Sequence, residues 1–154
     1  MAILEHNFLT LPMPVDWEDA SQVIALGPEE DGFRPNLVFS SEPVRRGEDS
    51  AAFAARQLPQ LRDALDYYQV IYEAPAAYGP NQGYLRHHAF RMEQGEVGQL
   101  QFYVVLAGRA HTFTFTHLRE KFPEALKMGE YLFAQARLNV NDLKDPDQLD
   151  TFDF

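Results

Sequence analysis

His111-Thr-Phe-Thr-Phe-Thr-His117 is the stretch of sequence that most directly indicates the fold. Successive side chains of a β-strand point to opposite faces of its sheet. Phe113 and Phe115 would therefore lie on one face, and the three threonines on the other. The alternation predicts a strand with one apolar and one polar face.

Two longer alternating stretches precede this strand, at Tyr84 to Met92 and at Val97 to Leu106. The loop between them contains Gly95, and Gly108 separates the second stretch from a strand over Ala110 to His117. Glycine in a short loop between alternating stretches is typical of a hairpin. We therefore expect a three-stranded antiparallel meander in the second half of the chain.

The two faces of this meander differ in chemistry. Gln101, Tyr103 and Val105 share a face, opposite Phe102 and Val104. We expect one apolar face, which the helices of the domain can cover. The other face mixes threonine, glutamine, tyrosine and valine, so it combines apolar area with hydrogen-bonding groups. It is either a plain solvent face of an antiparallel sheet or a recognition surface for a chain segment.

The rest of the chain contributes shorter strands and the link to the meander. Alternation predicts strands over residues 7–11, 21–26 and 36–41, and a weaker strand over residues 68–73. The order of elements is three strands, a helix, four strands and a second helix. It lacks a βαβ rhythm. That order predicts an α+β fold, with an antiparallel sheet and helices packed on it.

Two stretches have helical periodicity. The first begins after a possible N-cap at Asp49-Ser50 and continues to Leu65, with a bend expected at Pro59. The second begins near Phe122-Pro123, because proline suits the first helical position. Of its two possible buried faces, one carries Gly129 and Phe133. We expect the other to be buried, because it carries more apolar residues: Phe122, Ala125, Met128, Leu132 and Ala136.

Composition narrows the class of protein. The chain has 154 residues, a formal net charge of −10 and no cysteine. One domain over residues 1–139 is expected, followed by an acidic tail over residues 140–154 that is either solvated or a docking peptide. The negative charge argues against a partner that is nucleic acid or an anionic membrane. Without a visible targeting or membrane-spanning segment, the expected location is cytoplasmic, with no direct membrane insertion.

Motifs of known chemistry are absent from the sequence. It contains no nucleophile elbow, no phosphate-binding glycine loop and no zinc-protease motif. His87 and His88 would point to opposite faces of a strand, and His111 and His117 would lie about 20 Å apart along one. Ordinary surface or rim histidines therefore explain them better than a metal site. We expect no enzyme activity, no catalytic residues, no metal and no cofactor.

Several short motifs, taken in order, resemble DcrB-related proteins. They are Phe8-Leu-Thr-Leu-Pro12 with Asp16-Trp17-Glu-Asp19 and Ser21, then Pro35-Asn-Leu-Val-Phe-Ser-Ser-Glu-Pro43, Ala55-Arg-Gln-Leu58 and Leu100-Gln-Phe-Tyr-Val104. The similarity covers roughly residues 5–138 and implies an α/β sandwich similar to PsbP. One branch of the family comprises membrane-anchored lipoproteins, and another comprises the cytoplasmic Eag chaperones of type VI secretion. The lack of a signal sequence and lipobox cysteine favours the Eag branch.

The Eag resemblance implies a homodimeric chaperone. It would bind and shield the N-terminal transmembrane helices of a PAAR-containing or Rhs-type effector before the effector is loaded on the secretion spike. Family positions and the polar face of the meander together give the expected client-binding residues, which are Ile24, Val38, Ser40, Gln57, Gln101, Tyr103 and Thr114. The alternative is a non-enzymatic envelope or protein-binding module of the same fold.

Overall fold

The computed structural model describes residues 3–6 and 8–139, and the side chains of all of these except residues 5 and 6. Residues 22–137 form one compact unit, and the residues before them belong to a separate one. The expected acidic tail over residues 140–154 lies outside the described residues, and the boundary expected after residue 139 is therefore untested.

The N-terminal unit contains a two-stranded antiparallel hairpin of β1 (Ile3–His6) and β2 (Leu9–Pro12). Ile3 pairs with Pro12, and His6 pairs with Leu9. The strand predicted over residues 7–11 corresponds to β2, which begins at Leu9 and ends at Pro12, but its pairing with β1 was not predicted. Four residues per strand are too few to show a clear period, so the pattern did not reveal two paired segments.

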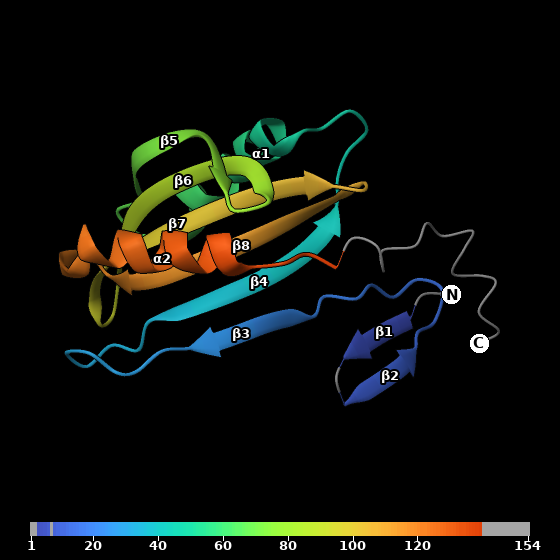
Figure 1. The fold of residues 1–154 in the computed structure, drawn as a ribbon, viewed down its shortest axis with the longest axis horizontal. Coiled ribbons are helices and arrows are strands. Elements are labelled where there is room, and N and C mark those ends of the chain that lie inside the picture. Colours follow the sequence, from blue (N-terminus) through green and yellow to red (C-terminus); the bar gives the residue numbers. More distant parts are fainter. Residues whose placement is uncertain (1–2, 7, 140–154) are drawn as a thin grey trace. The chain divides into compact units, whose positions relative to one another are not determined.

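The larger unit is built on a six-stranded antiparallel sheet in the order β3-β4-β8-β7-β6-β5 (Figure 1). Its elements are β3 (Gln22–Leu26), β4 (Asn36–Pro43), α1 (Ser50–Ala64), β5 (Gln69–Tyr78), β6 (Asn81–Met92), β7 (Gly95–Leu106), β8 (Arg109–Leu118), the 3-10 turn η1 (Arg119–Lys121) and α2 (Glu124–Gln135). The expected α+β class and the meander of β6, β7 and β8 are confirmed.

Helix α1 carries the chain from β4 to β5 at the far edge of the sheet, and the meander then returns β8 to pair with β4. The weak strand predicted over residues 68–73 is β5, which continues to Tyr78 and pairs along β6. The β7–β8 turn places Ala107 and Gly108 at φ angles of 53° and 75°. Glycine reaches this left-handed region without steric cost, which suits a tight hairpin.

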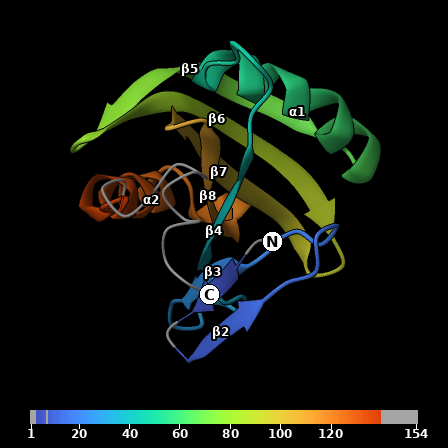
Figure 2. The same ribbon diagram turned by 90° about the vertical axis from the view of Figure 1, so that its right-hand side faces the viewer.

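Alternation along the strands gives the sheet two different faces, and one helix packs on each (Figure 2). Phe53 and Ala54 of α1 cluster with Tyr103 and Ala110. Phe133 of α2 packs against residues on the opposite face, the rings of Phe102 and Phe113. The expectation that both helices cover one apolar face is therefore wrong. The face with glutamine and threonine also has a helical cover, over β6 and β7.

The two helices were predicted with different success. The side chain of Asp49 accepts a hydrogen bond from the backbone N–H of Ala52 at 2.8 Å, which confirms the N-cap, and α1 continues through Pro59. The expected buried face of α2 is wrong, because Met128 is 53% exposed.

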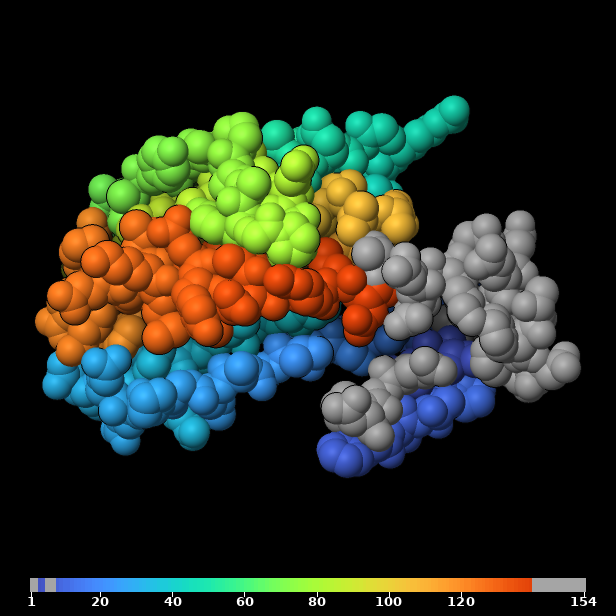
Figure 3. Space-filling view, in the orientation of Figure 1, coloured from blue at the N-terminus to red at the C-terminus, as the bar shows by residue number. Residues whose placement is uncertain are grey.

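The buried residues of α2 are Ala125, Gly129 and Phe133. A Cβ atom at Gly129 would come within 2.6 Å of the Leu100 side chain, so glycine lets this helix approach the sheet closely. Figure 3 shows α2 lying across this face of the unit.

Candidate functional site

A groove of about 410 Å³ lies on the α1 face of the sheet, beside the helix. Helix α1 packs on β6 and β7, and the groove opens beside it over residues of β8 and β4. The side chain of Ser50 accepts a hydrogen bond from the Val105 backbone N–H at 2.9 Å, which ties the start of the helix to β7. The groove is lined by Gln22, Val38, Ser40, Glu42, Phe53, Gln57, Leu61, Gln101, Tyr103, Thr112 and Thr114.

Strand register explains why these residues meet. One row across the sheet pairs Ile24 with Val38, Val38 with Thr114, and Thr114 with Gln101. The neighbouring row pairs Gln22 with Ser40, Ser40 with Thr112, and Thr112 with Tyr103. Residues paired across antiparallel strands have side chains on one face. The two rows therefore form a continuous floor, and α1 supplies one wall.

Six of the seven residues expected from the sequence line this groove. The exception is Ile24, which extends the row of Val38 onto the edge strand β3 and is 57% exposed. The sequence reasoning missed Gln22, Glu42, Phe53, Leu61 and Thr112. Thr112 could have been found, because it shares the threonine face with Thr114. The contributions of Phe53 and Leu61 depended on where α1 would cross the sheet.

A buried arginine extends the row of Thr114 and Gln101 onto β6, where Arg86 pairs with Gln101. Arg86 is 1% exposed, and its Nε donates to Glu73 Oε1 at 2.6 Å. Its other nitrogens donate to the backbone oxygen of Ala54 at 2.7 Å and to the Tyr103 hydroxyl at 2.8 Å. Burial alone would lower the pKa of the guanidinium. Tyr103 and the Glu73 carboxylate offset this and raise it overall, so the group stays charged.

The hydrogen bonds continue from Arg86 into the groove. The Tyr103 hydroxyl donates to Gln101 Oε1, and Gln101 Nε2 donates to Thr114 Oγ1 at 3.3 Å. Burial raises the pKa of Tyr103, so its hydroxyl keeps its proton. Its ring packs edge-on against Phe53, with ring centroids 5.9 Å apart. This series of hydrogen bonds links the buried charge of Arg86 to the half-buried amide of Gln101 at the groove surface.

A second series of hydrogen-bonded polar side chains starts at His88, two residues further along β6 than Arg86. His88 Nε2 lies 2.8 Å from Gln99 Oε1, and its Nδ1 lies 2.7 Å from the Tyr68 hydroxyl. Gln99 Nε2 donates to Thr116 Oγ1 at 2.9 Å. Burial lowers the pKa of His88 to about 4, so the imidazole is neutral at pH 7. Like the series that starts at Arg86, this one orients a β7 glutamine between a basic side chain and a threonine.

The histidines are less exposed than the sequence suggested. His88, His111 and His117 are all buried, so the expectation of surface or rim histidines is wrong for them. His87 and His88 do point to opposite faces, as predicted, because His87 packs against Phe122 on the α2 face. Within residues 3–6 and 8–139, no three histidine or carboxylate side chains gather as metal ligands would.

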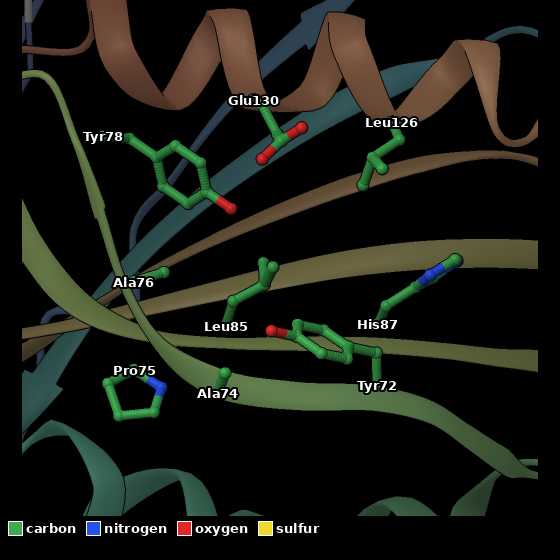
Figure 4. A pocket seen from close by; sticks show the side chains of 9 residues that line it. All are labelled: Tyr72, Ala74, Pro75, Ala76, Tyr78, Leu85, His87, Leu126 and Glu130. Atoms are coloured by element: carbon green, nitrogen blue, oxygen red, sulfur yellow. The ribbon is translucent and has the colours of Figure 1, made fainter.

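A second cavity, of about 340 Å³, lies between β5, β6 and α2 on the opposite face (Figure 4). Its walls are mostly apolar, with Leu85 and Leu126 among them. The Tyr78 hydroxyl faces the Glu130 carboxylate. Burial and the hydrogen bond to Glu130 raise the pKa of Tyr78. Its polar groups are fewer than those of the groove, and this cavity contains none of the residues expected from the sequence.

Comparison with known proteins gives a family and a set of folds. The family model for DcrB matches residues 9–127, from β2 into α2. No curated protein matches the sequence. No helix within the described ranges has both the length and the apolar character that crossing a membrane requires.

The solved structures that are similar to this chain include three from different organisms. PA94 of Pseudomonas aeruginosa, a protein of unknown function, has a TM-score of 0.71 at 16% identity, covering 90% of this chain and 96% of its own. LpqN, involved in cell envelope biogenesis of Mycobacterium tuberculosis, has a TM-score of 0.50 at 13% identity, covering 78% of this chain and 85% of its own. The PsbP of Synechocystis sp. PCC 6803 has a TM-score of 0.48 at 8% identity, covering 62% of each chain.

Proposed function

The chain belongs to the DcrB family, and from that premise we propose that it is an Eag-type chaperone of type VI secretion. It binds the N-terminal transmembrane helices of a PAAR-containing or Rhs-type effector in the cytoplasm and shields them before loading. Its role is binding rather than catalysis. The observation that carries the proposal is the groove beside α1, which brings together Val38, Gln57, Gln101 and Thr114.

The chemistry of the groove suits a membrane helix held in water. Such a helix exposes apolar area, whose burial contributes about 25 cal/mol per Å². Val38, Phe53 and Leu61 offer apolar contact for this purpose. Gln57 and Gln101 offer hydrogen bonds of the kind that join helices within a membrane. The net charge of −10 keeps such a complex soluble and disfavours contact with anionic lipid.

We propose that the working form is a homodimer. A helix with its side chains is about 10–12 Å across, and the groove offers a floor and one wall. A second copy would cover the side of the client that remains in water. The edge strand β3 leaves Val23, Ile24 and Leu26 largely exposed and, within the described residues, pairs only with β4.

A pair of matched charge insertions tests the function. Ile24 on the groove row and Met128 on α2 have similar exposed fractions, 57% and 53%, on different parts of the sheet unit. The probe is a synthetic peptide with about 20 apolar residues and lysines at both ends. In size-exclusion chromatography with light scattering, the wild-type dimer and Met128→Glu should carry the peptide, and Ile24→Glu should not. Equal peptide retention by all three proteins would refute the proposal.

The second candidate is a protein-binding module of the same fold that acts elsewhere, for example in the envelope. The cavity between β5 and α2 favours it, because that cavity lies on the other face of the sheet and the chaperone function does not use it. Under this alternative, Glu130→Ala would weaken partner binding and Ile24→Glu would leave it unchanged.

A further inference from the structure

We propose that Arg86 is a positioning residue that, through Tyr103, holds the Gln101 amide with an N–H donor facing the groove. This inference rests on the proposed function for the identity of the client. It adds which residue orients the binding group.

The direction of the hydrogen bonds starts at the arginine. A guanidinium has only donors, so the Tyr103 oxygen must accept from Arg86 across their 2.8 Å contact. Arg86 cannot turn away, because it is 1% exposed and also donates to Glu73 and to the Ala54 carbonyl of α1. These contacts fix Arg86 between β5 and the helix. The position of the Tyr103 oxygen is fixed with it.

The Tyr103 hydroxyl in turn determines how the Gln101 amide is oriented. Its hydroxyl has one proton, and Gln101 Oε1 is the acceptor that lies within reach. If the amide were turned over, Nε2 would face an oxygen already bonded to Arg86, and the buried hydroxyl proton would have no partner within the described residues. An unsatisfied buried donor costs about 1–3 kcal/mol. The orientation with Oε1 toward Tyr103 is therefore the stable one.

The remaining hydrogen of Gln101 determines what the groove offers. One N–H of Nε2 donates to Thr114 Oγ1, and the second has no partner in the part of the chain that the structure describes. Gln101 is half-buried and lines the groove. The amide therefore offers the client a donor, and the matching group is an acceptor.

The orientation can be tested on the free protein without a client. Tyr103→Phe removes the hydroxyl and keeps the ring, and Tyr84→Phe is its matched control because the Tyr84 hydroxyl donates to Glu73. In ¹⁵N NMR spectra, Tyr103→Phe and Arg86→Lys should move the Gln101 side-chain amide resonances, whereas Tyr84→Phe should not. Unchanged Gln101 resonances in folded Tyr103→Phe would overturn the inference, even if Arg86→Lys does not fold.

The effect on binding is then measured with one synthetic probe, a peptide of about 20 apolar residues with terminal lysines. Tyr103→Phe should bind it about fivefold more weakly than wild type, the scale of one hydrogen bond, and Tyr84→Phe should bind it as tightly as wild type. Equal affinities of Tyr103→Phe and wild type would overturn the inference. Failure of the wild type to bind the peptide would refute the proposed function, while the NMR result still decides the orientation of Gln101.

Discussion

The two faces of the central sheet are made by the same strands, yet they are packed in opposite ways. On the α2 face, Phe133 contacts Phe102 and Phe113, and Gly129 lets the helix lie close to the strands. On the other face, α1 covers β6 and β7 and leaves a groove over β8 and β4. Alternate residues of the same strand thus serve two purposes: one set packs against α2, and the other lies on the face that carries α1 and the groove.

The difference shows how a small domain can combine stability with an adaptable surface. Aromatic side chains bury large areas and make the α2 face rigid. The α1 face instead uses buried polar rows, in which Arg86 and His88 hold Gln101 and Gln99 through specific hydrogen bonds. We expect substitutions on the α2 face to change stability, and substitutions in the groove to change binding.

The largest expected effect is on the α2 face. Phe133→Ala should lower the free energy of unfolding by about 3–5 kcal/mol, because a fully buried aromatic ring leaves a cavity. Urea denaturation would measure the loss. The fraction of protein that stays folded should still bind the apolar peptide, because Phe133 lies on the face opposite the groove. A loss below about 1 kcal/mol would show that α2 is not a rigid part of the core.

An intermediate effect comes from pH. The pKa of His88 is about 4 in the folded protein, against 6.5 for an ordinary histidine. The unfolded chain therefore takes up its proton first. The stability linked to this residue is complete above pH 6.5 and is lost as the pH falls from about 6.5 to 4, by at most about 1.4 kcal/mol per pH unit.

Comparison of wild type with His88→Gln isolates that contribution. The pKa values of His87 and His111 are also lowered by burial, but those residues are present in both proteins. Denaturation at several pH values should give a shallower fall in unfolding free energy for His88→Gln. Equal slopes would mean that His88 is protonated as easily in the folded as in the unfolded chain.

The smallest expected effect on stability is in the groove wall. Gln57 is half-buried, so Gln57→Ala should change the unfolding free energy by about 0.5 kcal/mol or less. The affinity of the Gln57→Ala variant for the apolar peptide should nevertheless fall about fivefold. Gln60→Ala is the matched control, since Gln60 is an exposed glutamine of the same helix outside the groove. Equal affinities for both variants would remove Gln57 from the site.

Local patterns in the sequence predicted most of the sheet and much of the groove. Alternation gave β6, β7 and β8, and the threonine face of β8 identified Thr114 as a surface candidate. Family positions added Gln57 and Gln101, which the fold brings together. The strand predictions succeeded because strand alternation depends on neighbours in the chain rather than on long-range packing.

What the sequence could not reveal depends on contacts between distant segments. The buried face of α2 is decided by how closely Gly129 approaches Leu100, and the helical periodicity of the sequence does not reveal that approach. Arg86 is one charged residue in a strand until β5 places Glu73 beside it and α1 supplies the Ala54 carbonyl. The face that α1 covers likewise depends on the crossover between β4 and β5, which contains this helix.

The most direct test of the central claim is a methyl NMR titration of the wild-type protein with the apolar peptide. Val38 and Thr114 report on the groove, and Leu126 and Met128 report on the α2 face. The account predicts that the Val38 and Thr114 methyl signals shift with peptide, while those of Leu126 and Met128 stay in place. Shifts confined to Leu126 and Met128, or none at saturating peptide, would contradict it.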